Sequence, residues 1–169
     1  EISRICKIVK PKIGILTSII EQHLSLFGSL KNIQTAKYEL LRSIPETGLV
    51  ITNADNAYCT ELLSELTCQN QKLFGDEPDN QPDYLITETR AKAGTVSWQV
   101  QTDEPSPLLF TAAVLGAHQP YNITPAIIVA KHLGISDTEV ARAVTTLKPG
   151  ANALSWYQYQ AADIIDDTY

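Results

Sequence analysis

The stretch LKNIQTAKYELLRSI, residues 30–44, places a lysine on the apolar side of a helix. Its apolar residues recur three and four positions apart, which predicts an amphipathic helix over 30–44. They are Leu30, Ile33, Leu40 and Ile44. Lys37 falls on the same row. We therefore expect an amine in the middle of the face that packs against the protein.

Two interpretations of Lys37 stay open from the residues alone. In the first, its aliphatic stem packs along the core while the ammonium extends to solvent. In the second, the amine does chemistry. Apolar surroundings disfavour a charged ammonium and favour the neutral amine, which can add carbon dioxide to form a carbamate. A carbamate is an anionic oxygen group on a long arm, and Mg²⁺ prefers oxygen ligands.

Other polar residues follow apolar runs that predict strands, or precede an apolar helix. They are Glu21 and His23 after KIGIL, Asn53 and Asp55 after GLVITN, and His118 and Asn122 before the helix. A carboxylate such as that of Glu21 is a hard oxygen ligand, whereas imidazole is not a preferred Mg²⁺ ligand. A purely structural interpretation is also open: Asn53 and Asp55 make a turn and cap the next helix, and His118 and Asn122 shape the start of their own helix.

The first half of the chain alternates between predicted strands and helices. The predicted elements are a helix at 2–9, a strand at 12–16, the helix at 30–44, a strand at 48–53, a helix at 56–66 and a strand at 71–75. This alternation is typical of parallel βαβ units, which bind ligands at the carboxyl ends of their strands. The loops from Thr17 onward and at 53–55 are therefore the expected site.

The second half predicts an antiparallel section followed by two helices. After a polar link at 75–83, β-branched and aromatic residues predict a meander of three strands at 84–91, 94–101 and 107–115. A helix that carries Ile127, Ile128, Ala130 and Leu133 ends at Gly134. A second helix begins with a capping box of Ser136 and Glu139, and Pro149–Gly150 ends it. Strands at 153–160 and 162–167 are expected to open another domain.

Composition limits the class of protein. The 169 residues suffice for one domain with a core, or for one domain and a piece of another. A net charge of −6 argues against a nucleic-acid or anionic-membrane surface. No apolar run reaches the roughly 18–20 residues of a membrane span, and no signal peptide is visible. Cys6, Cys59 and Cys68 lack metal-site spacing and are expected to be reduced thiols of a cytoplasmic protein.

The order of these stretches carries more information than any one of them. The chain reads KPKIGILTSIIEQHL, FGSLKNIQTAKYELL, VITNADN, LGAHQPYNITPAIIVAKHLGI and IIDDTY in succession. This resembles the Mur ligase family, in which similar stretches read ITNIGEAHL, AKGE, NADD, GxHNxxNALAA and IIDDSYNANP. The likeness is greatest to the branch that joins D-alanyl-D-alanine to UDP-N-acetylmuramoyl-tripeptide in bacterial cell-wall synthesis.

The resemblance implies a fold and a domain division. The fold class is α/β: a three-layer, mostly parallel sheet with flanking helices, of the P-loop type, plus a small antiparallel β section. Residues 1–149 would form most of the central ATP-binding domain without its phosphate loop, and residues 150–169 the start of the C-terminal domain. Because the chain begins at Glu1 and stops after a predicted strand, we expect it to be a piece of a longer protein.

The resemblance also implies an ATP-dependent amide ligase that uses Mg²⁺. Such a ligase transfers the γ-phosphate to a carboxylate of a UDP-muramoyl peptide, and the amine of an amino acid or dipeptide attacks the acyl phosphate. Its partners would be these small molecules, with neither nucleic acid nor a membrane. By position, Lys37 matches the carbamylated lysine that helps to hold Mg²⁺, and His23 matches the metal-site histidine. Both are the implied catalytic and metal residues.

Four further positions match the family's nucleotide contacts. His118 and Gln119 fall beside the adenine, Asn122 matches a second asparagine there, and Asp167 matches the acidic residue that meets the ribose. No G-x-x-x-x-G-K-[ST] stretch is present, so the 169 residues alone are expected to be inactive.

Several residues depart from the family pattern. Ser18 replaces the asparagine of ITN, Ile20 replaces a glycine, Gln119 replaces the adenine-side asparagine, and Ala151 stands in place of a nucleotide-contacting arginine. These departures favour an alternative, a non-catalytic relative that serves as a nucleotide-binding or interaction scaffold. A second alternative is a ligase of the folylpolyglutamate synthase type, in which the dipeptide His118–Gln119 has a similar counterpart.

Overall fold

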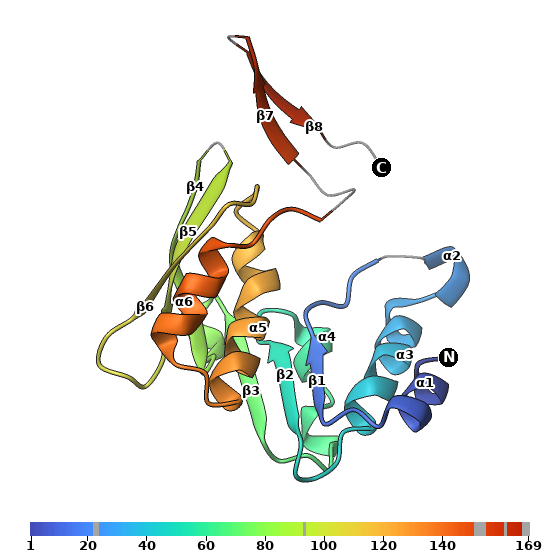
Figure 1. Ribbon diagram of the computed structural model, residues 1–169. Helices are drawn as coiled ribbons and strands as arrows, with labels where there is room; N and C mark the ends of the chain where they lie inside the picture. Colours follow the sequence, from blue (N-terminus) through green and yellow to red (C-terminus); the bar gives the residue numbers. More distant parts are fainter. Residues whose placement is uncertain (22–23, 93, 151–154, 161, 167–169) are drawn as a thin grey trace. The chain divides into compact units, whose positions relative to one another are not determined.

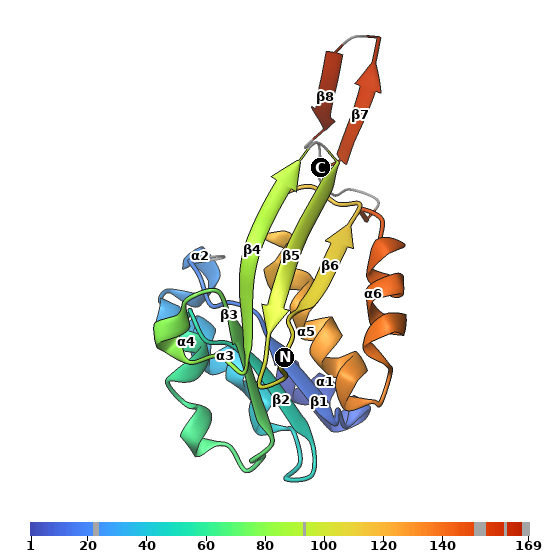
Figure 2. The same ribbon diagram turned by 90° about the vertical axis from the view of Figure 1, so that its left-hand side faces the viewer.

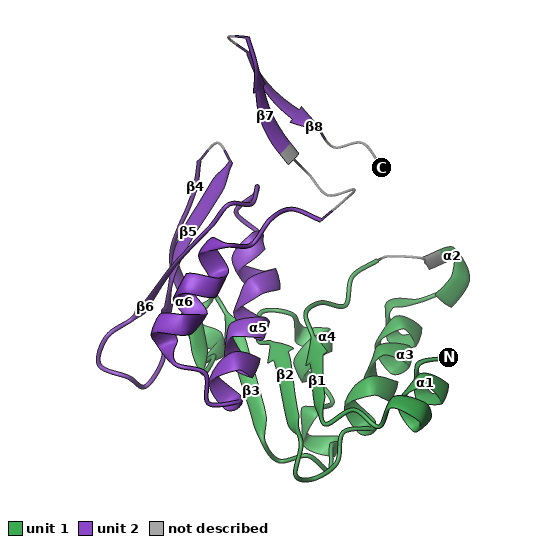
Figure 3. Ribbon diagram, in the orientation of Figure 1, with its two compact units in different colours: residues 1–85 green, residues 86–169 purple. Residues whose placement is uncertain are grey.

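The computed structural model describes residues 1–169 apart from 22–23, 93, 151–154, 161 and 167–169. The chain forms two compact units, residues 1–85 and residues 86–169, which Figure 3 distinguishes by colour. The six strands of the larger sheet have the order β1-β2-β3-β4-β5-β6, and β7 and β8 form a separate two-stranded sheet. The predicted α/β fold with parallel strand pairs and a small antiparallel section is confirmed.

Unit 1 consists of parallel strands with helices between them (Figure 1). Its strands are β1 (Ile13–Leu16), β2 (Leu49–Asn53), β3 (Gln71–Gly75) and the first residues of β4 (Tyr84–Lys92). Its helices are α1 (Ile2–Val9), α2 (Leu24–Phe27), α3 (Leu30–Arg42) and α4 (Ala57–Thr60), with 3₁₀ turns at Leu63–Glu65 and Pro78–Asn80. Partners such as Ile13 with Leu49 and Val50 with Gln71 set the parallel register. All five residues of β2 are buried, as expected for a central parallel strand.

The core of unit 1 lies between this sheet and α3. Buried apolar side chains from β1, β2, α3 and the segment after α4 pack together; they include Leu16, Ile33, Tyr38, Leu41, Ile44, Val50 and Leu66. Helix α3 starts at the N-cap Ser29, whose side chain accepts a hydrogen bond from the backbone of Asn32. The carboxyl ends of β1 and β2 therefore lie beside a helix that is fixed by its own packing.

The buried row of α3 differs from the predicted one. Its fully buried residues are Ile33, Gln34, Tyr38 and Leu41, whereas Lys37 is only partly buried. At about 100° per residue, Gln34, Tyr38 and Leu41 form a second row beside the predicted one, so the buried face of α3 is wider than the predicted stripe and extends to one side of it. Lys37 lies within this face, between Ile33 and Leu41, and is partly buried.

The helix predicted at 56–66 is interrupted. It consists of α4 and a separate 3₁₀ turn, and side chains of α3 supply the reason. In a continuous helix the Leu62 N–H would donate to the Tyr58 carbonyl. Instead, Gln34 Nε2 donates to that carbonyl at 2.8 Å, and the Leu62 N–H lies 3.4 Å from the Tyr38 hydroxyl. Tertiary contacts have therefore replaced helical hydrogen bonds.

Unit 2 contains a meander and two helices, visible in Figure 2. Strand β4 leads into β5 (Thr95–Gln101), which pairs antiparallel with β6 (Leu108–Ala112). The link at 75–83 does not fully separate the two halves, because Tyr84 and Leu85 of β4 pair in parallel with β3. The predicted meander is confirmed except for this parallel start.

Helices α5 (Gln119–His132) and α6 (Asp137–Thr145) pack on these strands. The predicted capping box is confirmed, since Ser136 and Glu139 each accept from the other's backbone N–H. Ile127 and Ile128 are buried as expected, but Leu133 is 65% exposed because the helix has already ended at His132. Strands β7 (Ser155–Tyr159) and β8 (Ala162–Asp166) pair antiparallel, as predicted. The predicted domain limit at residues 149/150 stays a prediction.

No helix within the described ranges is both long enough and apolar enough to span a membrane.

Candidate functional site

The carboxyl ends of β1 and β2 are bound together by side chains from three elements. Three consecutive backbone carbonyls, those of residues 17–19, each accept one hydrogen bond from a different side chain. The bonds are Asn53 Nδ2 to Thr17 O (2.9 Å), Lys37 Nζ to Ser18 O (2.8 Å) and Asn56 Nδ2 to Ile19 O (3.0 Å). The donors come from the end of β2, from α3 and from the start of α4. The segment after β1 is therefore held along its length.

Lys37 does not extend its amine into solvent. The amine turns inward to the Ser18 carbonyl, and the residue is half-buried. As an ammonium, Lys37 has three N–H donors and no lone pair, so it cannot ligate a cation in that form. Any metal role for Lys37 therefore requires the carbamate predicted from the resemblance, which stays a prediction.

Asp55 has a structural role beside this segment. Its N–H donates to Asn53 Oδ1 at 2.8 Å, which confirms the predicted turn. Its carboxylate accepts from the Asp76 N–H (2.7 Å) and from Asn80 Nδ2 (2.8 Å). A side chain at Gly75 would place its Cβ 2.4 Å from the Asp55 carboxylate, so only glycine fits there. The predicted cap is different: the N-cap residue of α4 is Asn56, not Asp55, and its side chain makes no capping hydrogen bond.

Tyr38 and Cys59 form a buried layer beside Lys37. The Tyr38 hydroxyl donates to the Cys59 carbonyl at 2.5 Å, and burial raises the pKa of Tyr38. Burial also raises the pKa of the Cys59 thiol to about 12, although the charge of Lys37 and a hydrogen bond from the Ile19 backbone act in the opposite direction. Cys59 is therefore a neutral thiol at physiological pH and is no candidate nucleophile.

The described residues contain no dense cluster of metal-ligating side chains. Within the ranges that the structure describes, no group of three or more His, Cys, Asp or Glu side chains lies close enough together to hold a metal ion. Glu21 is exposed, and His23 lies outside the described residues. A metal site built on Lys37 would thus need groups beyond those described.

Three of the four predicted nucleotide contacts lie on one helical turn in unit 2. His118 is the N-cap residue of α5, Gln119 Nε2 donates to the Leu115 carbonyl at 3.1 Å, and Asn122 Nδ2 lies 3.5 Å from Gln119 Oε1. Gly116 has φ +103°, and a Cβ there would lie 2.5 Å from the His118 ring, so this turn also requires glycine. Asp167, the fourth, lies outside the described residues.

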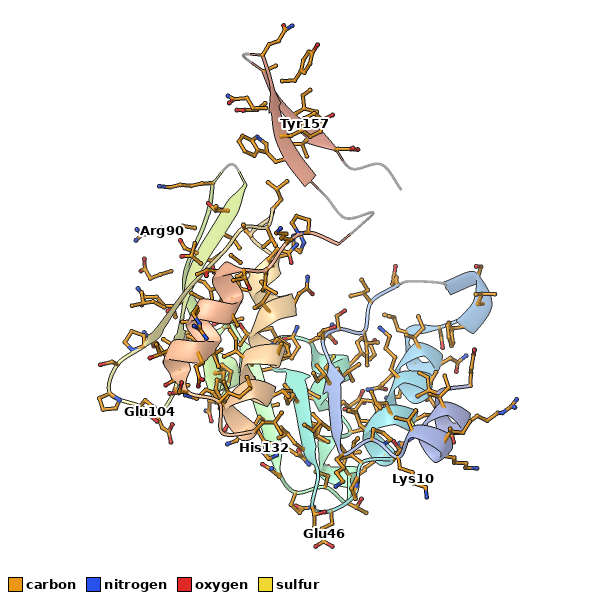
Figure 4. The ribbon with its side chains drawn as sticks, viewed as in Figure 1. Lys10, Glu46, Arg90, Glu104, His132 and Tyr157 are labelled. Atoms are coloured by element: carbon orange, nitrogen blue, oxygen red, sulfur yellow. The ribbon has the colours of Figure 1, made fainter. Side chains whose placement is uncertain are left out.

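Two charged surface residues lie at the end of unit 1 that is opposite the carboxyl ends of β1 and β2. In Figure 4, Lys10 and Glu46 lie where β1 and β2 begin, away from the carboxyl ends of these strands. Both side chains are exposed. This end of the unit is therefore suitable for control substitutions.

Asn56 is the site residue that sequence reasoning missed. The run NADN contains two amides three positions apart, but Asn56 alone is a common helix N-cap and gives no sign of another partner. Its role depends on the position of Ile19, which is distant in sequence. The burial and hydrogen bonds of Gln34 and Tyr38 could not be predicted for the same reason, because their partners lie on α4.

The architecture is that of an α/β domain with parallel strands, and domains of this class commonly bind ligands at the carboxyl ends of their strands. The family model of the Mur ligase middle domain matches residues 1–130, and the chain belongs to this family.

Relatives of known name match most or all of the chain. The UDP-N-acetylmuramate–L-alanine ligase of Salinispora arenicola is 27% identical over 143 residues, which cover 85% of this chain and 28% of the relative. The UDP-N-acetylmuramoyl-tripeptide–D-alanyl-D-alanine ligase of Bacillus subtilis is 25% identical over 170 residues and covers 100% of this chain and 35% of the relative. The chain thus spans about a third of the length of the curated relatives it matches.

Solved structures have the same fold. MurF from Acinetobacter baumannii matches with a TM-score of 0.88 and 25% identity, covering 100% of this chain and 36% of that one. The MurF ligase of Thermotoga maritima, crystallised in complex with ADP, matches with a TM-score of 0.80 and 24% identity, covering 99% of this chain and 38% of that one.

Proposed function

We propose that this chain is part of an ATP-dependent amide ligase of peptidoglycan precursor synthesis, acting in the cytoplasm. The observation that carries the proposal is the family match over residues 1–130 together with an alignment to a D-alanyl-D-alanine ligase that covers the whole chain. The strand-end cluster around Lys37 supports it, because it lies at the edge of the sheet where α/β domains bind their ligands.

The reaction of such a ligase forms an amide through an acyl phosphate. A carboxylate of a UDP-muramoyl peptide takes the γ-phosphate of ATP, and the amine of an amino acid or dipeptide displaces phosphate. A dipeptide substrate is favoured because two D-alanyl-D-alanine ligases match 100% of the chain, whereas the L-alanine ligases of Salinispora arenicola and Salinispora tropica match 85% and 95% of it. The solved ADP complex of a MurF ligase supports ATP as the nucleotide.

The residues of this chain would divide their roles between the two units. Lys37, as a carbamate, and His23 would contribute to holding Mg²⁺, whose role in such a reaction is to neutralise phosphate charge. His118, Gln119 and Asn122 would contact the adenine from the first turn of α5, where the exposed His118 and Asn122 are available to a ligand. Asp167 would contact the ribose.

The test is a ligation assay on the longer ligase that contains these residues. Phosphate release is measured with UDP-N-acetylmuramoyl-tripeptide and D-alanyl-D-alanine, and separately with UDP-N-acetylmuramate and L-alanine. We expect release that requires both the nucleotide-linked acid and the amine, with the dipeptide pair preferred. Release with glutamate and a folate instead would favour the folylpolyglutamate synthase type of ligase.

The second candidate function is a non-catalytic scaffold of the same fold. Ser18, Gln119 and Ala151, which depart from the family pattern, are the observation that favours it. In that case, the longer protein would bind nucleotide in a filter-binding assay and yet release no phosphate with any pair of substrates.

A further inference from the structure

Segment 17–19 accepts more side-chain hydrogen bonds than an ordinary connecting loop requires. Each of its three carbonyls has a side-chain donor, and the lysine's acceptor is the middle one. The two outer donors are the amides of Asn53 and Asn56. The position of the Ser18 carbonyl, and with it the Lys37 amine, is therefore set from both sides.

Asn56 does not make the capping hydrogen bond that is usual for an asparagine at a helix N-terminus. Asparagine at an N-cap usually accepts a hydrogen bond from the second or third N–H of its own helix. In α4 that bond is missing, and the Asn56 amide donates to Ile19 O, a residue 37 positions earlier in the chain. A side chain turned away from its own helix indicates that the contact to the segment has a role of its own.

The side chain of Asn53 also bonds to the segment, and both of its polar atoms are hydrogen-bonded. It is 7% exposed, its Oδ1 accepts from the Asp55 N–H, and its Nδ2 donates to Thr17 O. Both functional atoms of the amide are thus used. An aspartate would lack the donor, and an alanine would lack both atoms.

We propose that Asn53 and Asn56 are positioning residues for Lys37: they hold the carbonyls of Thr17 and Ile19, and so fix the Ser18 carbonyl that orients the lysine amine. This inference rests on the proposed function for its consequence in ligation, but its geometric part is independent of it. Among the described residues, Lys37 is then held at the strand ends by a backbone carbonyl.

The proposal also accounts for one departure from the family pattern. Ser18 stands where the resemblance places an asparagine, yet the atom that binds Lys37 is a main-chain oxygen. Every residue type supplies that oxygen. The departure at position 18 therefore leaves the orientation of Lys37 intact, and the side chains that matter for it are at positions 53 and 56.

The experiment measures how readily the Lys37 amine is acetylated in the chain. Asn53→Ser and Asn56→Ser are combined, because serine is neutral, can keep the turn and the N-cap, and is too short to reach segment 17–19. Acetylation at low reagent concentration is quantified by mass spectrometry, with Lys31 on the same helix as the internal reference. We expect the Lys37-to-Lys31 ratio to rise by about five-fold, the factor that corresponds to one lost hydrogen bond.

The matched control is Asn70→Ser. Asn70 is exposed and lies just before β3, at the other end of the strands, and it contacts other residues through its carbonyl. The control should leave the ratio unchanged. If the double variant fails to fold, Asn56→Ser alone is measured, since it keeps a preferred N-cap residue. An unchanged ratio in a folded variant overturns the proposal and leaves the two amides a purely structural role.

A second measurement separates this proposal from the proposed function. In the longer ligase, the same serine variants should lower kcat by more than they raise the KM for ATP, measured at a temperature at which they and Asn70→Ser are all folded. If the unsubstituted ligase shows no ligation, the proposed function fails and the acetylation ratio still decides the positioning role. If it ligates and the variants match it in both kcat and acetylation ratio, the positioning role alone is refuted.

Discussion

At the scale of single residues, the site is defined by what Lys37 and Cys59 can and cannot do. Lys37 donates to a backbone carbonyl at 2.8 Å, and its positive charge partly opposes the effect of burial on the neighbouring thiol. Cys59 is fully buried and neutral. The thiol is therefore not a reactive group in this neighbourhood, whereas the role of the Lys37 amine is tested by substitution.

In the proposed ligase, Lys37→Ala should reduce turnover by about 100-fold or more, the loss typical when one group that stabilises developing charge is removed. Added formate or acetate should restore part of the rate by replacing a carbamate oxygen. Lys31→Ala is the control, since Lys31 lies on the same helix and pairs with Glu61 at the surface. Full turnover in Lys37→Ala would refute the assignment of Lys37.

Cys59 should resist alkylation by iodoacetamide at pH 8 in the native chain and react once urea is added. Its pKa of about 12 keeps the native thiol protonated, whereas an unfolded thiol ionises near pH 8.5. Above that pH the unfolded state loses the proton first, so this group lowers stability by about 1.4 kcal/mol per pH unit up to about pH 12. Cys59→Ala should flatten this part of the stability–pH curve. Rapid native alkylation, mapped by mass spectrometry, would contradict the burial.

At the scale of elements, α3 organises unit 1 through polar side chains on its buried row. Gln34 and Tyr38 donate hydrogen bonds to the backbone carbonyls of Tyr58 and Cys59. These carbonyls therefore bond to side chains of α3 where α4 ends. The same helix presents Lys37 to the segment after β1. One helix thus sets both the shape of its neighbour and the position of the candidate site residue.

Tyr38→Phe should destabilise the chain by about 1–3 kcal/mol, because it leaves the buried Cys59 carbonyl without its donor. Denaturant unfolding followed by circular dichroism measures the change. Tyr58→Phe provides the comparison, since Tyr58 is 36% exposed, and it should change stability by less than about 0.5 kcal/mol. Equal stability of the two variants would show that the Tyr38 hydroxyl contributes nothing.

At the scale of the whole chain, the predicted site residues fall in both units. Unit 1 contains Lys37 and the amides that hold segment 17–19, and unit 2 contains the turn with His118 and Gln119. The 169 residues contain no glycine-rich phosphate loop. Groups that bind the triphosphate would have to come from outside these residues.

The chain alone should consequently bind ATP very weakly, with a dissociation constant above about 1 mM. Isothermal titration calorimetry with ATP and Mg²⁺ measures it, and the longer ligase serves as the positive control. A micromolar dissociation constant for the 169 residues would show that a phosphate cradle exists within them.

What the sequence by itself determined was the order and type of the elements. Apolar periodicity predicted α3 and β2, and the capping box at Ser136 and Glu139 was correct because it depends only on neighbouring residues. Local hydrogen bonds and apolar repeats depend only on residues close together in the sequence, so a short segment is enough to predict them. The resemblance to the family likewise came from the succession of such stretches along the chain.

Only the tertiary structure decided which polar atoms meet. The predicted helix at 56–66 is broken by side chains from α3, and Asn56 donates to a carbonyl 37 residues away. A buried backbone group must find a partner, but any donor within reach satisfies it, so the choice depends on packing and not on local sequence. Lys37 was correctly placed on a helix, whereas its acceptor, the Ser18 carbonyl, could be found only once β1 and α3 lay side by side.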